Sequence, residues 1–283
     1  GLAAAPVRAD GASYAGRSAL MRKQQVAVRG GVFDVEVWDA GEGDPVLYLH
    51  GEGRPTWTEY HGALAEKSHL IAPLHPGYGG STGTEQLQDL PDLIYYYLDF
   101  LDQLGLRDLP LIGHGLGGMI AAELAAVQPE RFTKLILISP MGLWIQDDPV
   151  EDFFAVPPAR LAELLYHDLD SAPARAAAEV PTEGDALIEY HVERAKSMAT
   201  AAKYLWPIPN RGLAKRTHRI AAPTLVVWGA SDRIASPAYA EAFRERINGS
   251  HVEIVERAGH LPHEEQPDRL AELTLSFLAG ADR

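Results

Sequence analysis

Hydrophobic positions along the first half of the chain alternate between short apolar runs and longer stretches with helical spacing. Apolar residues alternate around Gly30-Gly31 in the segment Gln25–Ala40, which predicts a β-hairpin. Short apolar runs predict buried strands, and apolar residues three or four positions apart predict helices. We expect strands at Pro45–His50, Leu70–Leu74, Leu109–Gly113 and Leu135–Ile138, and helices at Thr56–Glu66, Leu90–Leu104 and Gly115–Val127. Strands and helices that alternate with short links are typical of a parallel sheet covered on both faces.

The alternation stops after the fourth of these strands and resumes about eighty residues later. Residues 141–219 contain no obvious strand, and helical patterns cover Pro158–Tyr166 and Gly184–Tyr204. Strands are then expected at Thr224–Trp228 and Val252–Val255, and helices at Pro237–Ile247 and Pro267–Leu278. We therefore predict an α/β core of residues 25–140 and 220–283, a helical lid of residues 141–219, and a flexible N-terminal arm of residues 1–24.

Composition and charge exclude several classes of function. The formal net charge of -14 argues against nucleic-acid binding, which needs a basic surface, and against docking on an anionic membrane. The absence of cysteine excludes disulfides, thiolate metal sites and a cysteine nucleophile. Residues 1–20 lack the apolar core of an intact signal peptide, and we expect a cytoplasmic protein. We also expect a monomer or a homodimer.

The segment Gly113-His114-Gly115-Leu116-Gly117 lies between a predicted strand and a predicted helix. Gly-x-X-x-Gly in that context is the pattern of a nucleophile elbow, a sharp turn that carries the attacking residue at its apex, here position 115. A dinucleotide-binding turn also uses spaced glycines. However, that turn normally follows the first strand of its unit and needs an acidic residue after the next strand. The next strand here ends in Ser139-Pro140, which disfavours a dinucleotide site.

Three further motifs follow strands in an order that supports the elbow. His50-Gly51-Glu52-Gly53 follows an early strand, Asp232 follows a later one, and Gly259-His260 follows the last. This order resembles that of the α/β-hydrolase superfamily, in which the nucleophile, acid and histidine occur in the same sequence along the chain. The resemblance covers residues 25–280 and favours the branch of serine esterases and carbon–carbon bond hydrolases. The loop from His50 to Trp57 also resembles that of dehalogenases and epoxide hydrolases, which use an aspartate nucleophile.

The resemblance implies a role for each of these residues. His260 would move a proton between nucleophile and leaving group, and Asp232 would orient the imidazole. Backbone N–H groups of Leu116 and of Glu52 or Gly53 would form the oxyanion hole. No cofactor is implied. We expect no metal site, because no two histidines lie four positions apart on a predicted helix with a carboxylate.

Gly115 departs from the family pattern, because glycine has no side chain that could form an acyl-enzyme. Three explanations remain open. In the first, the glycine stands in place of a serine in an inactivated hydrolase. In the second, Asp232 and His260 act as a general base in a natural lyase, cyclase or cofactor-free oxygenase. The third explanation is a non-catalytic binder of small molecules. We favour the inactivated hydrolase, because the residues around position 115 retain a catalytic pattern.

Aromatic residues of the predicted lid suggest the nature of the ligand. Residues at helical spacing usually belong to a core, but a lid commonly covers the cleft above the elbow. Trp57, His114, Trp144 and Trp206 are the candidates for substrate contacts. We expect a small hydrophobic ester, lactone or related carbonyl compound as the substrate.

Overall fold

The structure is a computed structural model and describes residues 21–208 and 211–280. A single eight-stranded sheet has the spatial order β1-β2-β4-β3-β5-β6-β7-β8. Strands β1 and β2 form the predicted hairpin, β2 pairs antiparallel with β4, and the remaining neighbours are parallel. The strands are β1 Arg22–Val28, β2 Phe33–Ala40, β3 Pro45–Leu49, β4 His69–Pro73, β5 Leu109–His114, β6 Phe132–Ile138, β7 Thr224–Gly229 and β8 His251–Val255.

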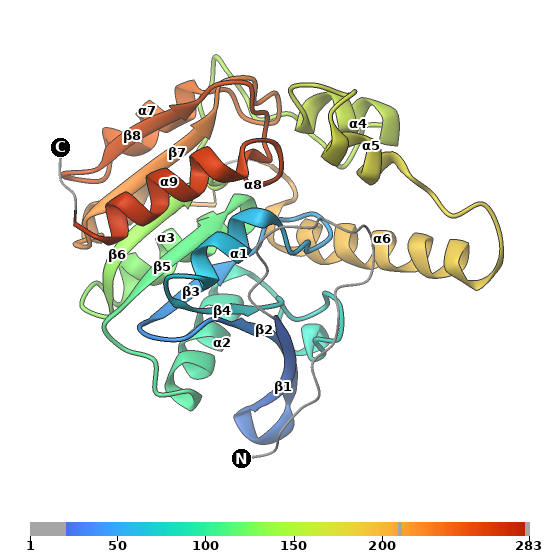
Figure 1. Ribbon diagram of the computed structural model, residues 1–283. Helices are drawn as coiled ribbons and strands as arrows, with labels where there is room; N and C mark the ends of the chain where they lie inside the picture. The colour runs from blue at the N-terminus through green and yellow to red at the C-terminus, as the bar shows by residue number, and fades with distance from the viewer. Residues whose placement is uncertain (1–20, 209–210, 281–283) are drawn as a thin grey trace.

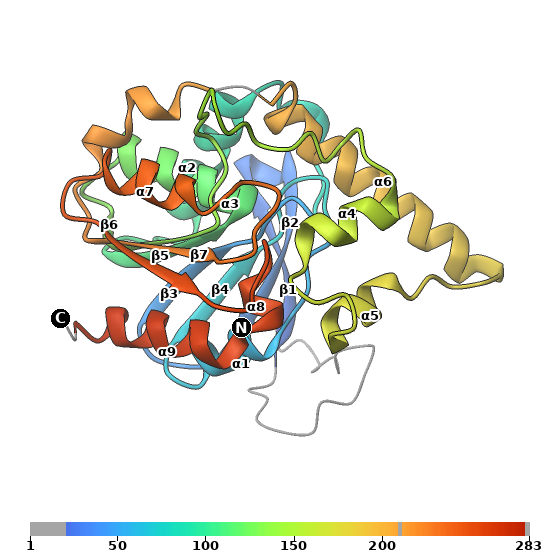
Figure 2. The same ribbon diagram turned by 90° about the horizontal axis from the view of Figure 1, so that it is seen from above.

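Helices cover both faces of the sheet, as the alternating pattern predicts (Figure 1). Helices α2, α3 and α7 lie on one face, and α1, α8 and α9 lie on the other (Figure 2). Their bounds are α1 Glu59–Ala65, α2 Leu90–Gln103, α3 Gly115–Val127, α7 Ala238–Arg244, α8 Pro262–Glu265 and α9 Pro267–Leu278. Each face buries its own apolar cluster, so the two layers of helices bury apolar surface on both sides of the strands.

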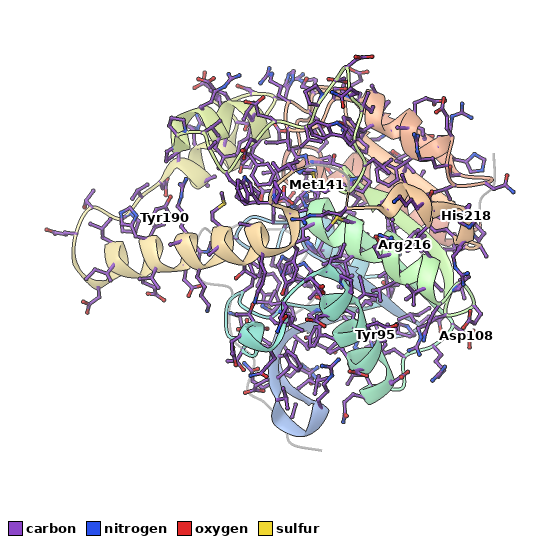
Figure 3. The ribbon with its side chains drawn as sticks, turned by 180° about the vertical axis from the view of Figure 1, so that it is seen from behind. Tyr95, Asp108, Met141, Tyr190, Arg216 and His218 are labelled. Atoms are coloured by element: carbon purple, nitrogen blue, oxygen red, sulfur yellow. The ribbon has the colours of Figure 1, made fainter. Side chains whose placement is uncertain are left out.

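The inserted segment carries the helices that connect the two parts of the sheet domain. Helices α4 Pro158–Leu165, α5 Ala172–Ala178 and α6 Gly184–Leu205 project to one side of the sheet, and Tyr190 is labelled far out on α6 (Figure 3). Between β6 and β7, the described residues form no strand, in agreement with the sequence pattern. None of the helices among the described residues is long and apolar enough to span a bilayer.

Contacts with α3 fix both ends of the insertion. At its start, the backbone N–H of Met141 donates to the carbonyl oxygen of Gly115 at 3.0 Å. At its end, Arg216 Nε donates to the buried carboxylate of Glu123 on α3 at 2.6 Å (Figure 3). The insertion is therefore joined to the helix that begins at the predicted elbow.

Several predicted boundaries differ from the structure. The predicted N-terminal arm is too long, because Arg22–Gln24 belong to β1, and its residues 1–20 lie outside the described residues. The helix predicted from Thr56 begins at Glu59, since the side chain of Thr58 caps it in an extended conformation. Strand β6 begins three residues before the predicted Leu135. The short helices α5 and α8 were not expected from the sequence.

Candidate active site

Gly115 lies at the apex of a sharp turn between β5 and α3. Its φ of +51° is in the left-handed region, which glycine adopts without the strain of a side chain. The elbow also requires close backbone contact around it. A Cβ atom on Gly113 would lie 2.3 Å from the carbonyl oxygen of Gly117. The small residues on either side of the apex thus allow the strand and the helix to approach.

Asp232 lies in the turn that follows β7 and is fully buried. Its Oδ1 atom accepts hydrogen bonds from the backbone N–H groups of Ile234 at 2.9 Å and Ala235 at 3.1 Å. Its Oδ2 atom lies 2.8 Å from Nδ1 of His260. The backbone of the turn therefore fixes one carboxylate oxygen and leaves the other directed at the imidazole.

His260 lies in the loop between β8 and α8, and none of its side chain is exposed. Its Nδ1 faces Asp232, and its Nε2 lies 2.9 Å from Oε1 of Glu52. The imidazole is thus held between two carboxylates. The structure brings the predicted acid and histidine together, with Nε2 directed toward the elbow.

The side chain of Glu52 fills the space at the apex of the elbow. A Cβ atom added to Gly115 would lie 2.3 Å from Oε2 of Glu52, closer than real Cβ contacts. The same Oε2 accepts a 3.0 Å hydrogen bond from the backbone N–H of Leu116. One of the predicted oxyanion-hole donors is therefore occupied by a carboxylate of the protein itself.

Burial and neighbouring charges shift the pKa values of Glu52 and His260 in opposite directions. Burial alone raises the pKa of Glu52, but the nearby His260 outweighs it and lowers that pKa to about 2. Burial likewise disfavours a charged His260, but the carboxylates of Asp232 and Glu52 outweigh it and raise its pKa to about 10. The site is consequently an imidazolium that donates one hydrogen bond to each carboxylate.

The predicted substrate contacts lie in different surroundings. His114 is buried, its Nε2 lies 2.8 Å from the carbonyl oxygen of His260, and its ring packs 4.5 Å from that of His263. Trp57 stacks on His61 and meets Trp38 edge to face. Because each has protein neighbours of its own, substrate binding by Trp57 and His114 stays a prediction.

The two lid tryptophans are less enclosed than His114. Trp144 is half-buried against the core, and its Nε1 donates to Gln146 at 3.2 Å. Trp206 follows α6 and is 52% exposed. Contact of either indole with a substrate therefore also stays a prediction.

The lid contacts the loops that carry the acid and the histidine. Tyr166, directly after α4, donates a 2.8 Å hydrogen bond from its hydroxyl to Oε2 of Glu264. Arg233, next to the acid, donates from Nη1 to the carbonyl oxygens of Glu163 at 2.6 Å and of Tyr166 at 3.2 Å. The end of α4 therefore rests directly on the loop that carries Asp232 and on α8, which follows His260.

Sequence reasoning missed the side chain of Glu52. It assigned only a backbone N–H group to Glu52 and Gly53, whereas the structure shows a buried carboxylate that reaches both His260 and Leu116. The signal in the sequence was the combination of a glycine at the apex with an acidic residue in the loop opposite. Gly53 itself is exposed.

Comparison with known proteins agrees with this architecture. The profile of the alpha/beta hydrolase family matches residues 46–273, most of the chain. The protein therefore belongs to the α/β-hydrolase family, and its mostly parallel sheet with flanking helices is the fold of that family.

Similar proteins include hydrolases and a larger enzyme component. The chain is 27% identical to 2-hydroxy-6-oxononadienedioate/2-hydroxy-6-oxononatrienedioate hydrolase of Comamonas testosteroni, over 88% of this chain and 92% of that protein. It is also 27% identical to the dihydrolipoyllysine-residue acetyltransferase component of the acetoin cleaving system of Cupriavidus necator, over 85% of this chain. The chain matches only 65% of the length of that component.

Solved structures share the fold at lower identity. A meta-cleavage product hydrolase from Pseudomonas fluorescens superposes with a TM-score of 0.75 at 19% identity, covering 92% of this chain and 98% of that chain. A bacterial membrane phospholipase A gives a TM-score of 0.75 at 24% identity, covering 92% of this chain and 86% of that chain.

Proposed function

We propose that this protein is a hydrolase-family enzyme that acts on a small hydrophobic ester, lactone or related carbonyl compound without a covalent serine. The pair of His260 and Asp232 would supply acid–base catalysis. As a serine hydrolase the chain would be inactive, because loss of the serine costs about six orders of magnitude in subtilisin. His260 and Asp232 would thus move protons to and from water or the substrate, and no serine would attack.

One observation carries this choice, namely the Glu52 carboxylate in the space next to Gly115. If the glycine had merely replaced a serine, the apex should retain room for the missing hydroxymethyl group. Instead, a Cβ there would lie 2.3 Å from Glu52 Oε2. A loop carboxylate that fills the apex and bonds to His260 supports a site built around glycine.

The inactivated hydrolase is the second candidate, and the intact acid–histidine pair favours it. Asp232 Oδ2 still lies 2.8 Å from His260 Nδ1, as a serine enzyme would require. In that case Glu52 would turn away when a serine is present. Gly115→Ser would then react with a fluorophosphonate probe and hydrolyse an aryl ester, whereas the unchanged protein would do neither.

The test compares the unchanged protein with a variant that lacks only the imidazole. We expect the protein with Gly115 to convert members of a panel of aryl esters and lactones, and His260→Ala to abolish that conversion. His251→Ala, an exposed histidine at the start of β8, is the matched control. Conversion that persists in His260→Ala, or binding without any conversion, would contradict the proposal.

A further inference from the structure

Glu52 presents its two carboxylate oxygens to two different partners. Oε1 lies 2.9 Å from Nε2 of His260, and Oε2 lies 3.0 Å from the backbone N–H of Leu116. The side chain is only 8% exposed. Its main chain is fixed as well, because the hydroxyl of Tyr78 donates to the carbonyl oxygen of Glu52 at 2.9 Å. The carboxylate is therefore a fixed anion at the apex of the elbow.

A purely structural carboxylate would be redundant at this position. Asp232 already accepts the Nδ1 hydrogen of His260, and two backbone N–H groups satisfy its other oxygen. A second buried carboxylate adds a desolvation cost, which the imidazolium offsets. It also leaves no room for a substrate carbonyl oxygen at the Leu116 N–H while Glu52 Oε2 is bound there. This arrangement therefore favours a reactive role for the Glu52 carboxylate over a purely structural role.

We propose that Glu52 is the nucleophile of this site and that Oε1 attacks a saturated ring carbon of an epoxide or other strained cyclic ether or lactone. This inference rests on the proposed function for one point, the acid–base role of His260 and Asp232. Carboxylate side chains are established nucleophiles in other enzymes, where they form covalent esters that water then cleaves.

In the first step, Oε1 forms a bond to the ring carbon as the bond from that carbon to the ring oxygen breaks. The electron pair of the broken bond stays on the ring oxygen, which takes the Nε2 proton of His260 and becomes a hydroxyl group. The products are an ester of Glu52 and a neutral imidazole that Asp232 still orients. Because the ester has no charge, the imidazole loses the anion that favoured its proton.

In the second step, neutral His260 removes a proton from water as the water oxygen bonds to Cδ of Glu52. The negative charge develops on Oε2, which already accepts the N–H of Leu116 at 3.0 Å. Collapse breaks the bond between Cδ and the oxygen attached to substrate. That oxygen takes the proton of the hydroxyl group that the water left on Cδ, so the product is released as an alcohol. Glu52 returns as a carboxylate and His260 as an imidazolium, and the net reaction adds one water to the opened ring.

The division of the two oxygens favours attack at saturated carbon. If Glu52 attacked a carbonyl carbon, the new oxyanion would belong to the substrate and would compete with Oε2 for Leu116. With a strained ring, the oxyanion of the hydrolytic step is Oε2 itself, so the existing hydrogen bond stabilises it without rearrangement.

The experiment is a single turnover of 1,2-epoxyhexane in water enriched in ¹⁸O, with the complete chain in excess over the probe. We expect an unlabelled diol, because its new oxygen comes from Glu52, and a mass gain of one ¹⁸O in the peptide containing Glu52. Chain incubated without epoxide gives the background exchange. A diol labelled in the first turnover, with an unlabelled peptide, would overturn the inference, and so would the absence of conversion.

Two variants separate this inference from the proposed function. His260→Gln lacks the base of the second step, so it should accumulate the ester of Glu52. The probe for this variant is 1-bromohexane, because bromide leaves without an acid, and the ester is detected as a mass adduct on the Glu52 peptide. Glu52→Gln should show no adduct, and its rate of epoxide opening should fall by at least about a thousandfold. Glu59→Gln, which changes an exposed glutamate nearby, is the control and should match the unchanged protein. Ester or lactone conversion that depends on His260, without any label or adduct on Glu52, would leave the proposed function standing and refute the nucleophile.

Discussion

The carbonyl oxygen of Leu165, the last residue of α4 in the insertion, accepts a 2.8 Å hydrogen bond from the backbone N–H of His260. The lid and the histidine loop are therefore joined at the main chain, directly beside the imidazole. Since His260 and Asp232 have no exposed side-chain surface, a neighbouring segment must move before a substrate reaches them, and α4 is one such neighbour. Access to the site is thus coupled to the position of α4.

The hydroxyl of Tyr166 provides a test of that coupling. Tyr166→Phe removes its hydrogen bond to Glu264 and should lower the free energy of unfolding by about 1 kcal/mol. It should also speed hydrogen–deuterium exchange in residues 158–166. Tyr190→Phe, on the projecting α6, is the control. Unchanged exchange in α4 would show that this contact does not hold the lid.

The apex glycine and Glu52 should be energetically coupled. Gly115→Ser places a side chain at φ +51° and 2.3 Å from Glu52 Oε2, so we expect it to lower the free energy of unfolding by about 1–3 kcal/mol. In the Glu52→Ala background, the same change should cost less, because the clash is gone and only the backbone strain remains. Urea denaturation of the two single variants and the double variant measures the coupling. Strict additivity would contradict the close contact.

Removal of the Glu52 charge should lower the pKa of His260. The titratable groups around His260 are Asp232, Glu52 and the neutral rings of His114 and His263. In Glu52→Gln, one of the two carboxylates that raise its pKa is absent, so the imidazolium should deprotonate at a lower pH. NMR titration of the imidazole measures the shift, and an unchanged titration would contradict the ion pair.

The same pair sets the pH dependence of stability. His260 has a folded pKa of about 10, above the unfolded value of 6.5, so its stabilisation is fully present below pH 6.5 and is lost as the pH rises through 10. Glu52 has a lowered pKa, so its contribution is present above 4.5 and is lost as the pH falls through about 2. Denaturation from pH 2 to 10 should show both losses in the unchanged protein. In Glu52→Gln, the acid loss due to Glu52 should be absent and the alkaline loss due to His260 should be smaller.

Asp232 should control both the tautomer and the charge of the imidazole. Asp232→Asn can keep its amide oxygen for the N–H groups of Ile234 and Ala235. Its NH2 group then faces His260 Nδ1, and an NH2 group cannot accept the Nδ1 hydrogen. We expect any His260-dependent turnover to fall by about 10⁴-fold, with little change in KM. The exposed Asp268→Asn is the control. A loss confined to KM would assign Asp232 to binding instead.

Much of the fold could be predicted because local rules determine it. Gly115–Val127 and Pro267–Leu278 match their helices to the residue, and Asp89 caps α2 through its side chain. The start of β6 at Phe132 was not predicted. The polar residues Thr133 and Lys134 separate Phe132 from the apolar run that begins at Leu135. Periodicity detects buried stretches and gives little information on the exposed ends of strands.

The chain order of motifs predicted that Asp232 and His260 would approach the elbow, and the structure places them within hydrogen-bond distance. The position of the Glu52 carboxylate could not be predicted in that way. Its contacts join residues 64 and 208 positions apart, and they depend on how one loop folds over the end of β5. Pattern rules apply along a segment, whereas a side chain in a loop is positioned by neighbours that are distant in sequence.

The two carboxylates and one imidazolium at the apex leave the site with a net charge of minus one, almost entirely buried. Low-dielectric surroundings make that charge felt at longer range than on the surface. A dianionic compound would be repelled at the moment when it loses its hydration shell, whereas a neutral one would pass. Asp232, Glu52 and His260, which hold the proton, should therefore also select neutral ligands over dianionic ones.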